Sequence, residues 1–303
     1  VWTDTALFTQ RFVGSPFTFA FSQVGTNCGL AGQNACVEVD GAAYWMSENG
    51  FFRYAGKLES LPCLVEDFVF DDINMESGNQ MISAGLNNLF GEVMWFYPQA
   101  TSTVVNRMVA YNYFDSSPRR PVWTVGSLSR TMWQDSAVFP KPHALEYDAS
   151  TDSSFDVVGN TEGRTAYYEH ETGTDQNKNG TITAITSNIS SGDFDITQRT
   201  AAGATTGTAD IRGDGEFLMK IRRFIPDFIS QTGNAQVTLE LRNFPNDTKA
   251  SSALGPFTVD STTQKVDTRA RARAISLKVA NTGASQTWKL GTFRLDIQPD
   301  GRR

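Results

Sequence analysis

The chain has 303 residues, of which 40% are hydrophobic, 12% aromatic and 19% charged, and its formal net charge is −7. This length allows two ordinary domains or one large β domain, and the high aromatic content favours strands over helices. No apolar run reaches the roughly 18 residues that a membrane-spanning helix needs, and the N-terminus lacks the basic head and apolar region of a signal peptide. Because the chain begins at Val1 rather than Met, we expect either processing of the N-terminus or missing upstream residues.

The stretch ACVEVDGAAYWMSENGFFRYAG predicts two consecutive hairpins. A strand ends at Val39, a turn follows at Asp40-Gly41, and further strands cover Ala43–Met46 and Phe51–Tyr54, with a second turn at residues 48–50 between them. Asp-Gly and Asn-Gly between apolar runs are strong hairpin signals.

Two similar groups of short apolar runs follow along the chain. They are FGEVMWFYP, RMVAYNYF and PVWTVGSL, then RTMWQD, HALEYDA and TAYYEHE. A meander of strands that repeats at roughly 40 to 50 residues is typical of propeller blades, in which large side chains pack neighbouring sheets. The alternative is a single irregular β-sandwich. The segment between the first two groups, VEDFVFDDINMESGNQM, is the least regular.

Charge divides the chain into two predicted domains. Residues 1–175 contain 9 Lys or Arg against 21 Asp or Glu, whereas residues 176–303 contain 17 against 12. We therefore predict an all-β protein with an acidic propeller-like or meander β domain at 1–175 and a basic β-sandwich or jelly-roll-like domain at 176–303. A Thr/Ala/Gly-rich loop or arm is expected at 197–215.

The second domain contains five strand candidates. They cover residues 215–229, 235–244, 255–260, 268–281 and 287–301. In the second candidate Val237, Leu239 and Leu241 fall on one face, and this period of two indicates a half-buried antiparallel strand.

An arginine row is expected on one face of the fourth candidate, where Arg269, Arg271 and Arg273 alternate with alanines. Such a row suits a polyanion, but it equally suits carboxylates of a neighbouring copy. We favour the second use, because an acidic and a basic domain in one chain invite head-to-tail contact.

The best metal-site match is DQNKNGTITAIT. Asp175, Asn177, Asn179 and Gly180 fit the opening of an EF-hand calcium loop, but position twelve is Thr186, so the bidentate carboxylate is absent. A polar turn between strands is the favoured interpretation.

A glycosidase argument could start from the acidic group Glu66, Asp67, Asp71 and Asp72. In a chain with this much negative charge, such groups are usually solvated surface. The arginines of the first domain do not assemble into a sialidase-like triad. They are Arg11, Arg53, Arg107, Arg119, Arg120, Arg130 and Arg164.

Histidine and cysteine are scarce, which leaves little material for a zinc site or a catalytic triad. His143 and His170 are predicted to be structural hydrogen-bonding residues. Cys28 and Cys36 could bridge a short hairpin, but three cysteines without a CxxC pattern favour free thiols, Cys63 included.

Several stretches together resemble a family of short-tailed bacteriophage virion proteins, the tail hub, nozzle or packaged-DNA stabilisation proteins. They are YWMSENGFFRYAGKLESLPC, VEDFVFDDIN, FGEVMWFYP, VAYNYF, WTVGSLSRTMWQD, YYEHETGTD, FLMKIRRFIPDF and WKLGTFRLDIQPDGRR. The resemblance runs in order from about residue 40 to the C-terminus, and RLDIQPDGRR is its most specific piece.

The resemblance implies a homo-hexameric ring below the portal and adaptor, in the tail tube that retains and conducts packaged DNA. It implies residence in the virion tail, with assembly in the host cytoplasm, transient non-specific contact with DNA and no membrane partner. No catalytic residue, metal or cofactor is expected. An acidic channel wall would repel the DNA backbone and let it slide. The alternative is a β-propeller carbohydrate-active enzyme or glycan-binding module.

Overall fold

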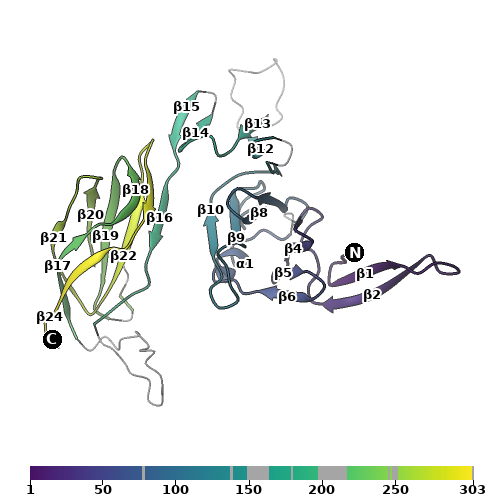
Figure 1. The fold of residues 1–303 in the computed structure, drawn as a ribbon, viewed down its shortest axis with the longest axis horizontal. Coiled ribbons are helices and arrows are strands. Elements are labelled where there is room, and N and C mark those ends of the chain that lie inside the picture. Colours follow the sequence, from purple (N-terminus) through teal and green to yellow (C-terminus); the bar gives the residue numbers. More distant parts are fainter. Residues whose placement is uncertain are drawn as a thin grey trace, which may run out of the picture. The chain divides into compact units, whose positions relative to one another are not determined.

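The computed structural model describes residues 1–76, 79–136, 139–148, 164–178, 180–196, 217–244, 246–247 and 252–301. In this part of the chain α1 (Glu66–Phe70) is the single α-helix, and all paired strands are antiparallel, which confirms the predicted all-β class. The chain divides into two compact units, Val1–Thr172 (unit 1) and Gly173–Arg303 (unit 2), close to the boundary predicted at residue 175 (Figure 1). No described helix is long and apolar enough to cross a membrane.

Unit 1 is built from sheets whose strands follow one another along the chain. A hairpin of β1 (Ala6–Phe12) and β2 (Phe19–Thr26) comes first. The first sheet contains β3 (Cys36–Val39), β4 (Ala42–Ser47), β5 (Gly50–Tyr54) and β6 (Leu58–Leu61). The second contains β7 (Ser83–Asn87), β8 (Glu92–Tyr97), β9 (Arg107–Asn112) and β10 (Trp123–Gly126). The third contains β11 (Met132–Gln134), β12 (His143–Asp148) and β13 (Arg164–Glu169).

The predicted hairpins of the first sheet are confirmed. Val39 pairs with Ala42 across a turn in which Asp40 and Gly41 both have positive φ, 49° and 81°. A two-residue type I′ turn requires this conformation at both central positions, which explains the Asp-Gly sequence. The second turn lies between β4 and β5, as the Asn-Gly signal predicted.

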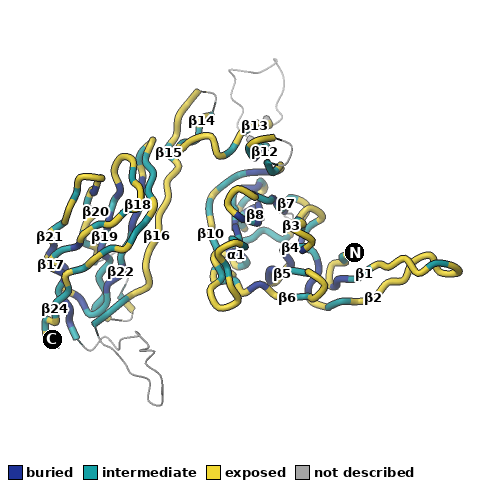
Figure 2. The backbone as a smooth tube through the Cα atoms, in the orientation of Figure 1, coloured by how far each residue is buried: buried dark blue, intermediate teal, exposed yellow. Residues whose placement is uncertain are grey.

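The aromatic runs form the core of unit 1. Trp95 on β8 and Phe51 on β5 are fully buried, with ring centroids 4.8 Å apart, and Trp123 on β10 lies 4.8 Å from Phe51. The Trp95 indole N–H donates a 3.0 Å hydrogen bond to the carbonyl of Ala35. Large side chains from the first and second sheets therefore pack against one another, in the dark-blue positions of Figure 2.

The third sheet contacts the second through Trp133. Its ring stacks on Phe96, with centroids 5.9 Å apart, and its N–H donates to the carbonyl of Leu86 at 2.9 Å. A Cβ atom at Gly85 would lie 2.7 Å from the Trp133 ring. Glycine at this position of β7 therefore makes room for the tryptophan.

Unit 2 buries one core between two sheets. One of these sheets has the strand order β16-β22-β19-β20, and the other has the order β21-β17-β24. Two further strand pairs, β18-β23 and β14-β15, also belong to unit 2. These strands are β14 (Asp175–Lys178), β15 (Thr181–Ala184), β16 (Ser187–Ser190), β17 (Met219–Ile225), β18 (Phe228–Thr232), β19 (Ala235–Arg242), β20 (Ala253–Val259), β21 (Val266–Ala272), β22 (Ala274–Asn281), β23 (Thr287–Leu290) and β24 (Arg294–Pro299). Val237 and Leu239 face the core, as predicted.

Three of the five strand predictions in unit 2 are wrong in one respect: each candidate contains two strands. The described part of the first candidate, from residue 217, contains β17 and the start of β18, and the candidate at 287–301 contains β23 and β24. The candidate at 268–281 contains most of β21 and all of β22, which belong to different sheets. Ala272 and Ile275 are both buried in the same core although they are three residues apart. An alternating pattern continues on both sides of such a crossing and therefore hides it. The loop predicted at 197–215 lies outside the described residues.

Candidate functional site

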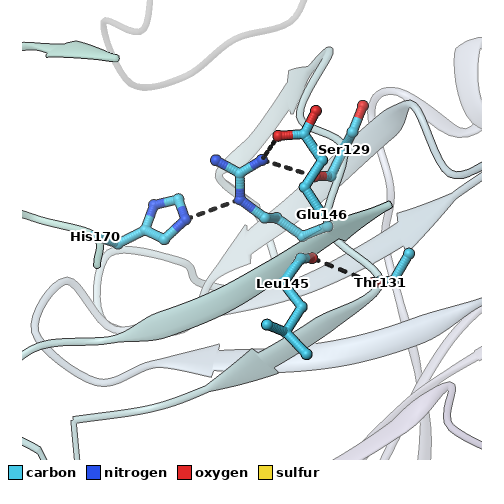
Figure 3. A network of polar contacts seen from close by, with 6 residues as sticks. Ser129, Thr131, Leu145, Glu146 and His170 are labelled. Atoms are coloured by element: carbon cyan, nitrogen blue, oxygen red, sulfur yellow. Dashed lines mark hydrogen bonds and ion pairs between the residues drawn. The ribbon is translucent and has the colours of Figure 1, made fainter. Parts of the chain in front are cut away.

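Among the charged residues of unit 1 whose burial is described, Arg130, which precedes β11, is the most buried, at 4% exposed. Its guanidinium donates to the carbonyl of Ser129 at 2.7 Å and lies 3.3 Å from a carboxylate oxygen of Glu146 on β12 (Figure 3). Its Nε donates to Nε2 of His170 at 2.9 Å, and its Cζ lies 4.2 Å from the centre of the Tyr168 ring. One side chain therefore links the start of the third sheet to its other two strands.

This environment fixes the charge states of the network. Burial lowers the pKa of Arg130 and the carboxylate of Glu146 opposes the decrease, and a guanidinium stays charged in either case. Burial first, then Arg130 and His143, lower the pKa of His170 to about 4. His170 is therefore a neutral hydrogen-bond acceptor near pH 7. This geometry is that of a structural histidine, as the sequence predicted, and not that of a base open to substrate.

We expect His170 to make the stability of unit 1 depend on pH. The pKa of His170 is about 4 in the folded chain, while the unfolded value is about 6.5, so the unfolded state binds the proton more readily between these values. This contribution is complete above about pH 6.5 and is lost as the pH falls toward 4. Thermal denaturation of the wild type and His170→Gln, from about pH 7.5 to about 4.5, should show a shallower loss in the variant.

His143→Gln serves as the control for this experiment, because it also removes one histidine from the same sheet. It should retain most of the decrease of the wild type, because burial and Arg130, the two largest causes of the lowered His170 pKa, remain. Equal slopes for the wild type and His170→Gln would contradict the assignment.

An apolar pocket opens on the same sheet. Its volume is about 420 Å³, and it is lined by Met132, Gln134, Phe139, His143, Ala144, Leu145 and Tyr167. His143 contacts the Tyr167 hydroxyl through Nδ1, and its ring lies 4.4 Å from that of Phe139. The walls are mainly aromatic and aliphatic, so the pocket suits an apolar or aromatic group more than an ion.

A scan against protein-family models finds no matching family, and a search of curated proteins finds no significant match.

The acidic group predicted as solvated surface lies at the short helix. Glu66, Asp67 and Asp71 are exposed, while the half-buried Asp72 forms a 3.5 Å ion pair with Arg107. Within the described ranges, no three His, Cys, Asp or Glu side chains gather as metal ligands.

The calcium-loop match is a β-hairpin in the structure, which confirms the predicted polar turn. Both Asp175 carboxylate oxygens accept 2.8 Å hydrogen bonds from the backbone N–H of Ser285, and Asn177 accepts from the N–H of Gly180. Asn179 lies outside the described residues. Asp175 therefore connects the hairpin to a neighbouring turn of unit 2, while Asn177 closes the hairpin's own turn.

The cysteines are free thiols, so the hypothetical bridge between Cys28 and Cys36 does not form. Cys28 is fully buried, and burial raises the pKa of Cys36 and Cys63 to about 11. Such thiols carry little thiolate near neutral pH, so they react slowly.

The arginine row differs from the prediction in two ways. Arg269 and Arg271 are exposed on β21, but Arg273 lies at the bend after it and is partly buried. Arg271 pairs with Asp300 of the same chain.

An arginine on the neighbouring strand β17 is also paired with carboxylates of the same chain. Arg223 lies 3.5 Å from Asp267 and 3.6 Å from Asp296. Carboxylates of this chain therefore form some of the ion pairs that were expected with a neighbouring copy.

Sequence reasoning missed the central role of Arg130 and the pocket. Both combine residues from strands that are distant in sequence, such as Arg130 with His170 and Met132 with Tyr167. Only the pairing of β11, β12 and β13 brings them together.

Proposed function

We propose that this chain is a structural subunit of a short-tailed bacteriophage tail, in its hub or nozzle, and that its copies form a homo-hexameric ring. The observation that carries the proposal is the ordered resemblance to that virion family. Its segments coincide with buried strands of both units, including β4, β8 and β17. A resemblance carried by core strands concerns the whole architecture and not one exposed motif.

The arrangement of unit 1 supports its interpretation as propeller-like. Consecutive four-stranded meanders pack through large aromatic side chains, as neighbouring blades do. We interpret unit 2 as a β-sandwich or jelly-roll-like domain, because two sheets share its core.

The polar contacts support a structural role. Arg130, Glu146 and His170 satisfy one another across three strands, and Asp175 holds the turn at Ser285. We propose that these groups stabilise the fold and that the chain catalyses no reaction.

The proposed role in the particle follows from charge. Residues 1–175 contain 21 acidic against 9 basic side chains, so an acidic channel wall would let packaged DNA slide without sticking. The further partners are the portal, the adaptor and other tail proteins, and the site of action is the virion tail.

The test is assembly of the purified chain. We expect light scattering and negative-stain microscopy to find six-fold rings with the mass of six chains of 33.3 kDa each, and mass spectrometry to find the chain in purified particles. We expect no retention of duplex DNA by these rings at physiological salt. A chain that stays monomeric at tens of micromolar and is absent from particles would contradict the proposal.

The second candidate function is binding or cleavage of surface carbohydrate. The aromatic pocket favours it, because Phe139 and Tyr167 offer ring faces on which a sugar can stack. Polysaccharide retention by the wild type, lost in Tyr167→Ala, would support this function over the structural one.

A further inference from the structure

The β1–β2 hairpin is anchored at one end and exposed over the rest of its length. Near its root, Leu7 is 4% exposed and packs with Cys28 and Trp45 of unit 1. From Gln10 to Gln23 every residue except Gly14 is exposed, as the yellow outer part of the hairpin in Figure 2 shows. We call residues 10–23 the arm.

The two faces of the arm differ in chemistry. Phe12 lies opposite Phe19, and Gln10 lies opposite Phe21, so three phenyl rings share one face. These rings are 74%, 51% and 60% exposed, and Phe17 at the tip is 74% exposed. The other face of the paired strands carries Arg11, Ala20 and Ser22, while Val13, which is 53% exposed, lies toward the tip. A two-stranded ribbon has no core of its own, so an aromatic face of this kind marks a contact surface.

A protein partner fits the arm better than a lipid bilayer. Near the root of the hairpin, the backbone of Phe8 bonds to Val1. From there to the tip, neither edge of this two-stranded sheet has a strand partner in the described part of the chain. Unpaired backbone groups cost several kcal/mol each in hydrocarbon, whereas a protein surface can bond to them. Arg11 is the single charged residue between positions 5 and 37, so no basic cluster attracts an anionic membrane surface.

The third sheet of unit 1 offers a matching apolar surface. Its pocket of about 420 Å³ is open, and three of its lining residues, Met132, Phe139 and Tyr167, are 52%, 47% and 63% exposed. The arm leaves unit 1 beside the first sheet and extends away from β12 (Figure 1). The arm and the pocket of one chain are therefore placed to meet those of different copies, and such a contact is heterologous and generates rings or filaments.

We propose that the arm docks its aromatic face on unit 1 of a second copy, with Phe17 entering the pocket of that copy's third sheet. This inference rests on the ring assembly proposed above and names the contact that builds it. The four exposed phenyl groups represent on the order of 500 Å² of apolar surface, against about 800 Å² per partner in a standard interface. The arm therefore supplies most of the apolar part of one subunit contact.

The first test compares two double variants of the full chain. Phe17→Ser with Phe21→Ser removes apolar surface from the arm, while Ile229→Ser with Phe244→Ser removes it from unit 2, where both residues are 67% exposed. We expect the arm variant to weaken association by about 30-fold or more and the control to assemble like the wild type. Melting temperatures measured at concentrations where the chains are dissociated should be unchanged in both, because all four side chains are exposed.

The outcomes separate the two proposals. A wild type that remains monomeric contradicts the ring, and the arm inference falls with it. Rings formed equally by the wild type and the arm variant overturn the arm inference and leave the ring proposal standing. Binding of monomeric wild type to phosphatidylcholine vesicles, lost in the arm variant, overturns the protein partner in favour of lipid.

The second test identifies the receiving surface. Chains carrying Phe17→Cys and chains carrying Met132→Cys are mixed and oxidised, with Phe17→Cys and Ile229→Cys as the control pair. We expect a disulfide-linked dimer in the first mixture alone. The native thiols give little background, because burial raises the pKa of Cys36 and Cys63 to about 11. Equal cross-linking in both mixtures, or none in either, would overturn the assignment of the pocket.

Discussion

Replacing Trp95 with alanine is expected to lower the free energy of unfolding of unit 1 by about 3 to 5 kcal/mol. The indole is fully buried between the first two sheets, against Phe51 and Trp123, and it satisfies the carbonyl of Ala35. The variant therefore loses apolar burial and leaves a cavity, while the Ala35 carbonyl keeps only its 3.1 Å hydrogen bond from the Met46 N–H. Urea unfolding followed by circular dichroism measures the change.

Leu64→Ala is the control for Trp95→Ala. Leu64 belongs to the same unit but is 77% exposed, so its truncation should change the free energy of unfolding by less than about 0.5 kcal/mol. A similar small effect for both variants would mean that the aromatic residues do not hold the first two sheets together.

Replacing Arg130 with methionine is expected to destabilise unit 1 by about 3 to 5 kcal/mol. The change keeps much of the side-chain volume but removes the charge, so Glu146 and His170 lose the cation that bonds to both. The side chain of Glu146 is 16% exposed, and removing the cation beside a carboxylate at such a position is costly. Adding Glu146→Gln to the variant should recover part of the loss, as a double-mutant cycle would measure.

The matched control is Arg53→Met in the first sheet. Arg53 and Glu59 form a 3.1 Å ion pair, but their side chains are 34% and 45% exposed. Exposed pairs contribute about 1 kcal/mol or less, so this variant should remain close to the wild type. Equal losses in Arg53→Met and Arg130→Met would show that burial does not determine the contribution of Arg130.

Local signals made the first sheet predictable. The turn at Asp40-Gly41 needs a positive φ at both residues, and few sequences other than Asp-Gly or Asn-Gly provide it. The turn chemistry and the flanking apolar runs lie within a few residues of each other, so the pairing of Val39 with Ala42 followed from the sequence. The buried face of β19 was predictable for the same reason, because the alternation of Val237 and Leu239 is local.

The arm shows why a local pattern can be present and still be incomplete. Phe17, Phe19 and Phe21 alternate with small or polar residues, which usually predicts a face buried in the chain's own core. Whether such a face is covered depends on strands that are distant in sequence. The five-residue helix α1 was missed as well, because one turn and a half contains too few residues to establish a helical period.

The crossing at Arg273 and the network of Arg130 depend on long-range geometry. The sequence of β21 and β22 alternates on both sides of the crossing, so no residue marks the change of sheet. The contact between Arg130 and His170 joins residues that are 40 positions apart. The pairing register of three strands decides this contact, and single-sequence patterns do not specify it.

The chain-consecutive sheets of unit 1 have a consequence for its synthesis on the ribosome. The first sheet ends at Leu61, and its buried Phe51 lacks its partner Trp95 until β8 has emerged. At a translation rate of 5 to 20 residues per second, an interval on the order of a few seconds separates Phe51 from Trp95. During that interval the emerged first sheet exposes the apolar face that Trp95 later covers, which favours non-native contacts with other chains.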